Sequence, residues 1–293
     1  MSARAVGAGL LLEVRPLPMA AAVLTVLFGV GWARGDLRTL PPSTGPLVAS
    51  VFFGLYTAHL MDTYVDASLR GDATPASYPW YFRDSTALIP KASYPPLVAA
   101  SAALCALLAI PAALTAGPAV AILLGAALAL ALTYAPLLDR HMLGVSLGYP
   151  AGVAAVLSAA YLAAGGLPDL PFLLLTASLV VALAGTKVRS DVIDLDEDRR
   201  GEKRTVAVAL GPVRAVRLGY GLALAGLGGA ALVPLAFPVN PALAVPPVAS
   251  ALAVLATARR EPLRSSFAMA LSLLGLLAAD VAILAAFPRP LPV

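Results

Sequence analysis

The chain has 293 residues, of which 60% are hydrophobic and only 12% are charged, and its mean hydropathy is +0.87. A soluble domain is typically about 45–50% apolar and about 25% charged, so this composition excludes an ordinary soluble protein and indicates a membrane protein. The net charge of +4 does not suggest a nucleic-acid partner, because the basic residues flank apolar segments, where they set topology and meet lipid head groups or phosphates.

Apolar runs recur along the whole chain and are too long and continuous for the alternating strands of a membrane barrel. We expect a short interfacial helix over 8–15, broken by Pro16 and Pro18. The remainder of the single domain, residues 1–293, is predicted to be an all-α integral membrane protein with nine transmembrane helices. The predicted helices are 18–33, 46–66, 94–114, 118–135, 143–165, 171–190, 213–235, 241–258 and 265–286.

The basic residues are divided unevenly between the two sides of the predicted bundle. Of the 20 Lys and Arg, all except Arg34, Arg38 and Arg289 fall before the first helix or in connections on the same side as that segment. The positive-inside rule therefore places the N-terminus and these connections in the cytoplasm and the C-terminus outside. Most acidic residues gather in the same connections, which the rule does not require. This favours a polar site on the cytoplasmic face.

The second predicted helix ends in the sequence YTAHLMDTYVDASLRGD. Asp62 and Asp66 are four residues apart and share one helix face, and His59 joins the same stripe. Two carboxylates on an apolar face repel each other, and a divalent cation removes the repulsion. Mg²⁺ prefers such oxygen ligands, one or two at a time, with phosphate oxygens completing its shell. The alternative is a solvated helix end whose acids pair with Arg70.

The densest polar segment, TKVRSDVIDLDEDRRGEKRTVAVALG, follows the sixth predicted helix. Asp191, Asp194 and Asp198 have the spacing i, i+3, i+7, which predicts that they stack on one helix face. Asp196 and Glu197 point away from that face and are expected to be in solvent. The chain therefore has two carboxylate stripes on one side of the membrane, each able to hold one Mg²⁺, with a diphosphate bridging the two ions.

Three basic residues accompany the second stripe. Lys203 and Arg204 follow it within reach of a bound phosphate, and Lys187 lies one helical turn before Asp191. Cations near a leaving diphosphate would stabilise its developing negative charge. The alternative for each cation is a loop charge that only sets topology.

These motifs resemble those of the UbiA-type intramembrane prenyltransferases, relatives of para-hydroxybenzoate polyprenyltransferase, over roughly residues 10–286. The second stripe is similar to the family's D-x-x-D-x-x-x-D, followed by a basic–Thr pair and a glycine, here Arg204, Thr205 and Gly211. LLLEVRPLP resembles the family's Arg-Pro entry into its first helix. IPKAS is similar to the segment after the first motif, with Lys91 as its cation. TYAPLLDR resembles a tyrosine-led loop, and LGVSLGYPAG the start of the fifth helix.

The chain departs from the family pattern in three places. The family's first motif usually reads N-D-x-x-D-x-x-x-D, and Ala58 and His59 replace its first two residues. Since Mg²⁺ favours oxygen ligands, His59 is expected to contact a phosphate or the acceptor. Leu138 stands where the tyrosine-led loop often has a lysine, and Arg140 is expected to replace it. Residues 67–88 form an unusual segment, interpreted as an interfacial lid, an acceptor wall or an ordinary aromatic belt.

The resemblance implies a helix bundle around a central cavity with cytoplasmic cap loops. It also implies Mg²⁺-dependent transfer of a prenyl group from a polyprenyl diphosphate, such as geranylgeranyl diphosphate, to a hydrophobic acceptor in the membrane. Tyr134 and Tyr149 would contact the substrate and its carbocation, and Tyr161 and Asp280 are weaker candidates that also suit packing roles.

The acceptor stays open between an aromatic ring, a glycerol-phosphate lipid and another isoprenoid. Two alternatives to a prenyltransferase also remain. One is a terpene cyclase or carotenoid-elongating relative that uses the same ionisation chemistry. The other is a non-enzymatic cation-binding membrane protein, which the clustering of charge at one face disfavours, because transporter sites usually lie near the middle of the bilayer.

Overall fold

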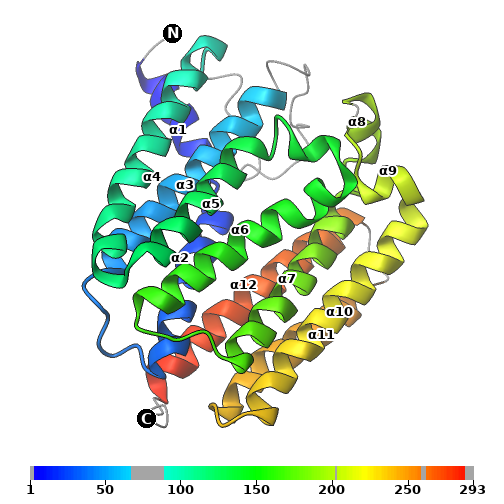
Figure 1. Cartoon of the computed structure of the whole chain (residues 1–293). Coiled ribbons are helices and arrows are strands. Elements are labelled where there is room, and N and C mark those ends of the chain that lie inside the picture. Colours follow the sequence, from blue (N-terminus) through cyan, green and yellow to red (C-terminus); the bar gives the residue numbers. More distant parts are fainter. Residues whose placement is uncertain (1–2, 67–88, 202, 259–261, 288–293) are drawn as a thin grey trace.

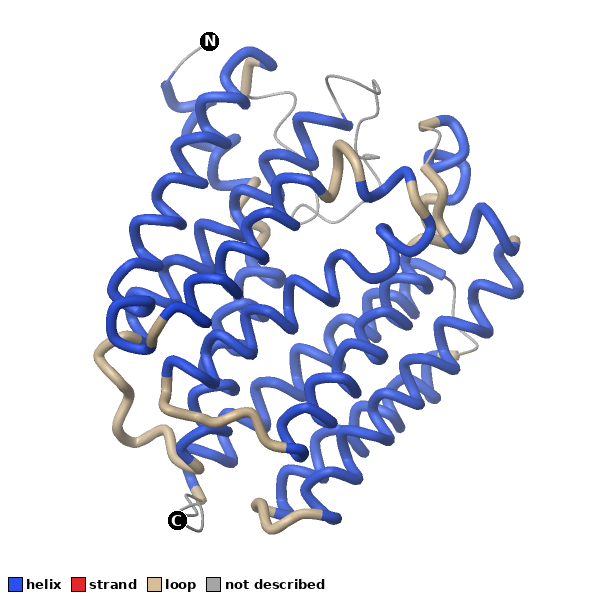
Figure 2. The backbone as a smooth tube through the Cα atoms, viewed as in Figure 1, coloured by secondary structure: helices blue, strands red, loops and turns tan. Residues whose placement is uncertain are grey.

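The computed structural model describes residues 3–66, 89–201, 203–258 and 262–287, and in these residues every regular element is a helix (Figures 1 and 2). Nine apolar helices of the described chain form the bundle. They are α2 (Pro16–Arg34), α3 (Thr44–Tyr64), α4 (Tyr94–Ala116), α5 (Pro118–Thr133), α6 (Met142–Ala163), α7 (Leu170–Ser190), α10 (Pro212–Ala236), α11 (Val245–Thr257) and α12 (Pro262–Ala286).

Seven helices in the described residues are long and apolar enough to cross a membrane, so the chain is an integral membrane protein. The other two are shorter, since α5 has 16 residues and α11 has 13. At a rise of 1.5 Å per residue α5 spans about 24 Å, less than the hydrocarbon core of about 30 Å. The helix bounds differ from the predicted ones by only a few residues, but length and composition support seven membrane-crossing helices where nine were predicted.

The charged connections gather at one end of the bundle, called the polar end below. Figure 1 shows α1 (Ala3–Leu12), the end of α3, the loop between α5 and α6, and the short helices α8 (Leu195–Arg200) and α9 (Val206–Leu210) at this end. The C-terminal end of α12 lies at the opposite end of the bundle, as the predicted orientation requires. That the polar end faces the cytoplasm stays a prediction from the charge distribution.

Glycines bring α7 into close contact with α10. A Cβ atom at Gly185 of α7 would overlap the backbone of Ala223, and one at Gly226 of α10 would overlap the backbone of Ala182. Membrane helices gain stability from such close packing, because lipid provides no hydrophobic force to bring them together. This packing fixes the C-terminal end of α7, which carries the start of the second aspartate stripe.

Buried hydroxyl groups join α3 to α4. Ser50 Oγ donates to the carbonyl of Cys105 at 2.9 Å, and Ser101 Oγ donates to the carbonyl of Phe53 at 2.9 Å. Cys105 is a buried free cysteine. These bonds satisfy buried polar groups and set the register of α3, whose C-terminal end carries the first aspartate stripe.

A hollow of about 180 Å³ lies between α4 and α5 and is lined by apolar residues that include Ala109 and Leu124. Its lining residues on α4 begin at Cys105, more than two turns from the start of that helix at the polar end. The hollow is therefore separate from the aspartate stripes. The central cavity that the family resemblance implies stays a prediction.

Candidate active site

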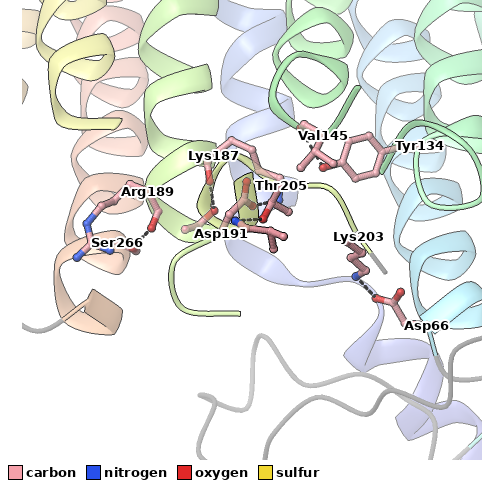
Figure 3. Close-up of polar contacts among 11 residues, drawn as sticks. Asp66, Tyr134, Val145, Lys187, Arg189, Asp191, Lys203, Thr205 and Ser266 are labelled. Carbon is pink, nitrogen blue, oxygen red and sulfur yellow. Dashed lines mark hydrogen bonds and ion pairs between the residues drawn. The ribbon is translucent and has the colours of Figure 1, made fainter. Parts of the chain in front are cut away.

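The first stripe lies at the C-terminal end of α3 and is partly open to solvent. The side chains of Asp62 and Asp66 are 37% and 26% exposed. Arg15 Nη1 lies 3.6 Å from Asp62 Oδ2, and Lys203 Nζ donates to Asp66 Oδ2 at 3.2 Å (Figure 3). Both carboxylates therefore face basic side chains that come from distant parts of the sequence.

The second stripe is not carried by one continuous helix, in contrast to the prediction. Helix α7 ends at Ser190, Asp191 and Asp194 belong to the following turn, and only Asp198 lies within α8. Ser190 Oγ donates to the carbonyl of Lys187 at 2.8 Å. Short polar side chains compete with helical backbone hydrogen bonds in this way, and this favours the end of the helix at that point.

The break in the helix still leaves these acids in different environments. Asp191 and Asp198 are only 1% and 5% exposed. The side chain of Asp196 is 90% exposed, whereas Asp194 and Glu197 are half-buried. The outward position predicted for Asp196 is thus what the structure has, and Glu197 is less exposed than predicted.

Asp191 and Asp198 lie close to lysines, but the charge of these lysines does not fully offset the cost of burying the two carboxylates. Lys187 forms an ion pair with Asp191 one turn later (Figure 3), and Asp191 Oδ2 has no hydrogen-bond partner among the described residues. Burial raises the pKa of Asp191, and the nearby charge of Lys187 opposes this rise only in part. Burial also raises the pKa of Asp198 to about 7, against the charges of Lys187 and Lys203. An added cation would offset the free-energy cost of burying both carboxylates in their charged form.

Tyr134, directly after α5, lies within electrostatic range of both stripes. Its hydroxyl donates to the carbonyl of Val145 at 3.2 Å (Figure 3). Burial raises the pKa of Tyr134, the charge of Lys187 lowers it, and the charges of Asp191 and Asp62 raise it. One acid from each stripe is therefore near the same phenol group, so the fold brings together two stripes that are far apart in the sequence.

A backbone contact ties the segment after the second stripe to the loop between α5 and α6. The amide of Arg204 donates to the carbonyl of Asp139 at 3.3 Å, and the amide of Lys203 donates to the carbonyl of Asp198 at 2.9 Å. Thr205 caps α9, accepting from the amide of Val208 at 3.2 Å. Asp139 is 4% exposed and was not predicted as a site residue. The sequence signal that could have identified it is an acid directly after the mostly apolar stretch TYAPLL.

The remaining predicted cations lie at the surface. Lys91 begins the short helix η3 (Lys91–Ser93), which precedes α4. Lys91, Arg140 and Arg204 are all exposed. Tyr149 on α6 is 42% exposed. Contacts of these residues with a diphosphate or a substrate stay predictions, and the predicted segment 67–88, with Arg70, lies outside the described residues.

His59 faces the N-terminal segment. Its Nδ1 lies 3.1 Å from the carbonyl oxygen of Glu13, which can only accept, so Nδ1 donates. The predicted contact of His59 with a phosphate or acceptor therefore stays a prediction. Glu13, 0% exposed, and Arg15 were not among the predicted site residues. The sequence signal that could have identified them is the pair of charges in the otherwise apolar stretch LLLEVRPLP.

Tyr161 and Asp280 lie away from the stripes. The ring of Tyr161 stacks on Phe172 with centroids 3.8 Å apart, and its hydroxyl donates to the carbonyl of Leu167 at 2.9 Å. This is the packing role that was the alternative for Tyr161. Asp280 is 3% exposed and lies near the end of α12 that is opposite to the polar end.

The carboxylates alone do not form a closed metal cage. Within residues 3–66, 89–201, 203–258 and 262–287, no three His, Cys, Asp or Glu side chains are grouped so that they could hold a metal ion. Three basic side chains instead lie beside the aspartates, namely Arg15, Lys187 and Lys203. The arrangement is an open polar site of mixed charge at the end of an apolar bundle.

A model of the UbiA prenyltransferase family matches residues 90–284, which is more than half of the chain. The chain belongs to the UbiA prenyltransferase family. The matched region contains the second stripe and begins after the first. The match specifies no subtype, so the relation to para-hydroxybenzoate enzymes in particular stays a prediction.

Solved structures share the UbiA fold. An apo UbiA homologue from Aeropyrum pernix K1 has a TM-score of 0.72 and 22% identity, covering 91% of this chain and 98% of that one. A UbiA homologue from Archaeoglobus fulgidus bound to DMAPP and Mg²⁺ has a TM-score of 0.69 and 14% identity, covering 94% and 99%. A structure of digeranylgeranylglyceryl phosphate synthase has a TM-score of 0.60 and 12% identity, covering 94% and 99%. A comparison with curated proteins finds no significant match.

Proposed function

We propose that this UbiA member transfers a prenyl group from a polyprenyl diphosphate to a hydrophobic acceptor in the membrane, with Mg²⁺ as cofactor. The observation that carries the proposal is the ion pair of 3.2 Å between Lys203 and Asp66, because it joins the segment after the second stripe to the first stripe. The Archaeoglobus fulgidus homologues bound to DMAPP or GPP together with Mg²⁺ support the same donor class and the same metal.

The residues present suit Mg²⁺. Asp191 Oδ2 is a buried carboxylate oxygen with no hydrogen-bond partner among the described residues, an arrangement that costs free energy until a cation or donor meets it. Mg²⁺ prefers one or two carboxylates plus substrate phosphates, which suits a site without a closed cage of acids. The carboxylates that would hold it are Asp62 and Asp66 on one side and Asp191, Asp194 and Asp198 on the other.

Mg²⁺, when bound, supplies positive charge that stabilises the diphosphate as a leaving group. The chain adds charge of its own, since Lys187 and Lys203 stand beside the acids and would donate to diphosphate oxygens while the C–O bond breaks. Arg204, Lys91 and Arg140 are proposed to complete the phosphate contacts from the surface.

The carbocation that remains requires an apolar site from which water is excluded. The ring of Tyr134 packs on Gly148 of α6 and is held by its hydrogen bond to Val145, so we assign to it the stabilisation of the allylic cation. The acceptor then attacks C1 of the prenyl group and loses a proton. We propose Tyr149 and His59 as residues that contact the substrate, and geranylgeranyl diphosphate as the first donor to test.

The proposal is tested by diphosphate release from DMAPP, GPP and geranylgeranyl diphosphate, with and without Mg²⁺ and candidate acceptors, using purified protein. Asp191→Asn should abolish release, and Asp196→Asn, a matched change at an exposed acid of the same segment, should preserve it. Absence of release with every donor would contradict the proposal. Release without an acceptor, together with a hydrocarbon product, would identify a cyclase instead.

The polar end is proposed to face the cytoplasm, because it carries most of the Lys and Arg. A reporter enzyme that is active only outside the cytoplasm, fused after the last residue, should be active, and the same reporter fused at the N-terminus should be inactive. The reverse pattern would place the polar end outside.

A further inference from the structure

The segment before α2 is fastened to the last turns of α3. Glu13 is 0% exposed, and its Oε2 accepts a hydrogen bond from Thr63 Oγ1 at 3.1 Å. The carbonyl of Glu13 accepts from His59 Nδ1 at 3.1 Å, and Tyr56 donates its hydroxyl to the carbonyl of Leu10 at 3.1 Å. Three side chains of α3, spread over two turns, therefore hold this segment beside the first aspartate stripe.

Arg15 is strained and is held by the same contacts. Its φ of 45° and ψ of 79° make it the one residue other than glycine with a positive φ in the described chain, and the left-handed region is unfavourable for a residue with a Cβ. Arg15 Nη2 donates to Thr63 Oγ1 at 3.1 Å and lies 3.8 Å from Glu13 Oε2, and its Nη1 lies 3.6 Å from Asp62 Oδ2. The strained backbone aims a guanidinium at a proposed metal ligand.

Thr63 links the two charges. Its hydroxyl accepts from Arg15 and donates to Glu13, so a single side chain next to Asp62 is oriented by both. Because Glu13 is fully buried, its negative charge is screened little by solvent and acts strongly on the guanidinium nearby.

We propose that Glu13 is a positioning residue of the first stripe, which restrains Arg15 and offsets its charge so that Asp62 stays available to Mg²⁺. The inference rests on the proposed function and deepens it. Arg15 and Mg²⁺ compete for the same carboxylate. Removing the charge of Glu13 leaves Arg15 to neutralise Asp62 more completely, and removing Arg15 eliminates the competitor.

Two substitutions that each remove one charge separate this role from a purely structural one. Glu13→Gln keeps the size and can still accept from Thr63, and it should weaken Mg²⁺ binding by about threefold to tenfold, a factor in the lower part of the range for charges coupled in one network. Arg15→Gln should strengthen Mg²⁺ binding by a similar factor. If the segment only supported the fold, both variants would weaken binding. Tyr56→Phe, which removes an anchoring hydrogen bond but no charge, is the matched control and should leave the Kd within about twofold.

The experiment measures the Kd for Mg²⁺ by isothermal titration calorimetry on the full-length protein in detergent, without a prenyl diphosphate, and repeats it with Mn²⁺ by electron paramagnetic resonance. Opposite shifts for Glu13→Gln and Arg15→Gln are the expected result, and shifts in the same direction or no shift would overturn the inference. If Glu13→Gln does not fold, Arg15→Gln decides alone, and an unchanged or higher Kd overturns it. Absence of diphosphate release by the wild-type protein from every prenyl donor would reject the proposed function as well, whereas a wild-type protein that releases diphosphate but whose variants lack the opposite shifts rejects only the role of Glu13.

Discussion

The aspartates at the end of α3 and those that follow α7 differ in burial and in the origin of their counter-charges. Asp62 is 37% exposed, and its basic neighbour, Arg15, belongs to another segment of the chain. Asp191 is 1% exposed, and its basic neighbour, Lys187, lies four residues earlier in the last turn of α7.

This difference affects how each stripe is maintained. A buried ion pair is costly to break because the remaining charge stays without compensation, whereas an exposed pair contributes little to stability. The counter-charge of Asp191 is therefore set locally by α7, which packs on α10. The counter-charges of the first stripe instead depend on contacts between distant segments. The following predictions test this comparison.

The largest expected effect is the loss of turnover when either stripe loses a metal ligand. Asp62→Ala and Asp194→Ala should each lower the rate of diphosphate release by at least about 100-fold, since even removing groups that only orient a metal ligand costs 10–100-fold. The melting temperature in detergent should change little, because both side chains are partly exposed. Loss of activity in only one variant would show that the stripes are not two halves of one site.

The next effect concerns stability and should distinguish the buried stripe. Lys187→Met removes the counter-charge of buried Asp191, and we expect a loss of about 2 kcal/mol, below the usual range for a fully buried pair because Lys187 is 27% exposed. Mg²⁺ should restore part of this stability by supplying charge to Asp191. Thermal unfolding with and without Mg²⁺ measures both quantities. A variant with wild-type stability would show that Asp191 does not depend on Lys187.

A smaller effect is expected for the ion pair that joins the stripes. Lys203→Ala should lower the rate of diphosphate release about tenfold through loss of a phosphate donor, with a change of less than about 1 kcal/mol in stability. Arg199→Ala is the matched control, because Arg199 forms a surface ion pair with Asp196 at 3.7 Å. This variant should retain activity. Equal rates for the two variants would remove Lys203 from the site.

The smallest effect is expected at the outward acid of the second stripe. Asp196→Ala should keep the rate of diphosphate release within about twofold of wild type, since its side chain is 90% exposed and surface substitutions usually change little. A loss equal to that of Asp194→Ala would mean that Asp196 faces the substrate, and the division of this segment into inward and outward acids would be wrong.

The sequence by itself determined the membrane class, the helix positions and the family. Apolar runs mark helices because each must lie in lipid with its backbone hydrogen bonds satisfied, and this information is local. The proposal of Asp62, Asp66, Asp191 and Asp194 as site residues also rests on local information, since charge and spacing suggest it without any knowledge of packing. The regular spacing also suggested one continuous helix for the second stripe, and there local periodicity failed, because a turn follows Ser190.

Only the tertiary structure decided which charges meet. Lys203 and Asp66 are 137 residues apart, and neither spacing nor hydropathy carries information about such a contact. The same is true of Glu13, whose burial depends on how the segment before α2 packs on the end of α3. Spacing along a helix fixes which residues share a face, but the packing of the helices fixes which faces oppose each other, and the electrostatics of the site depend on the second.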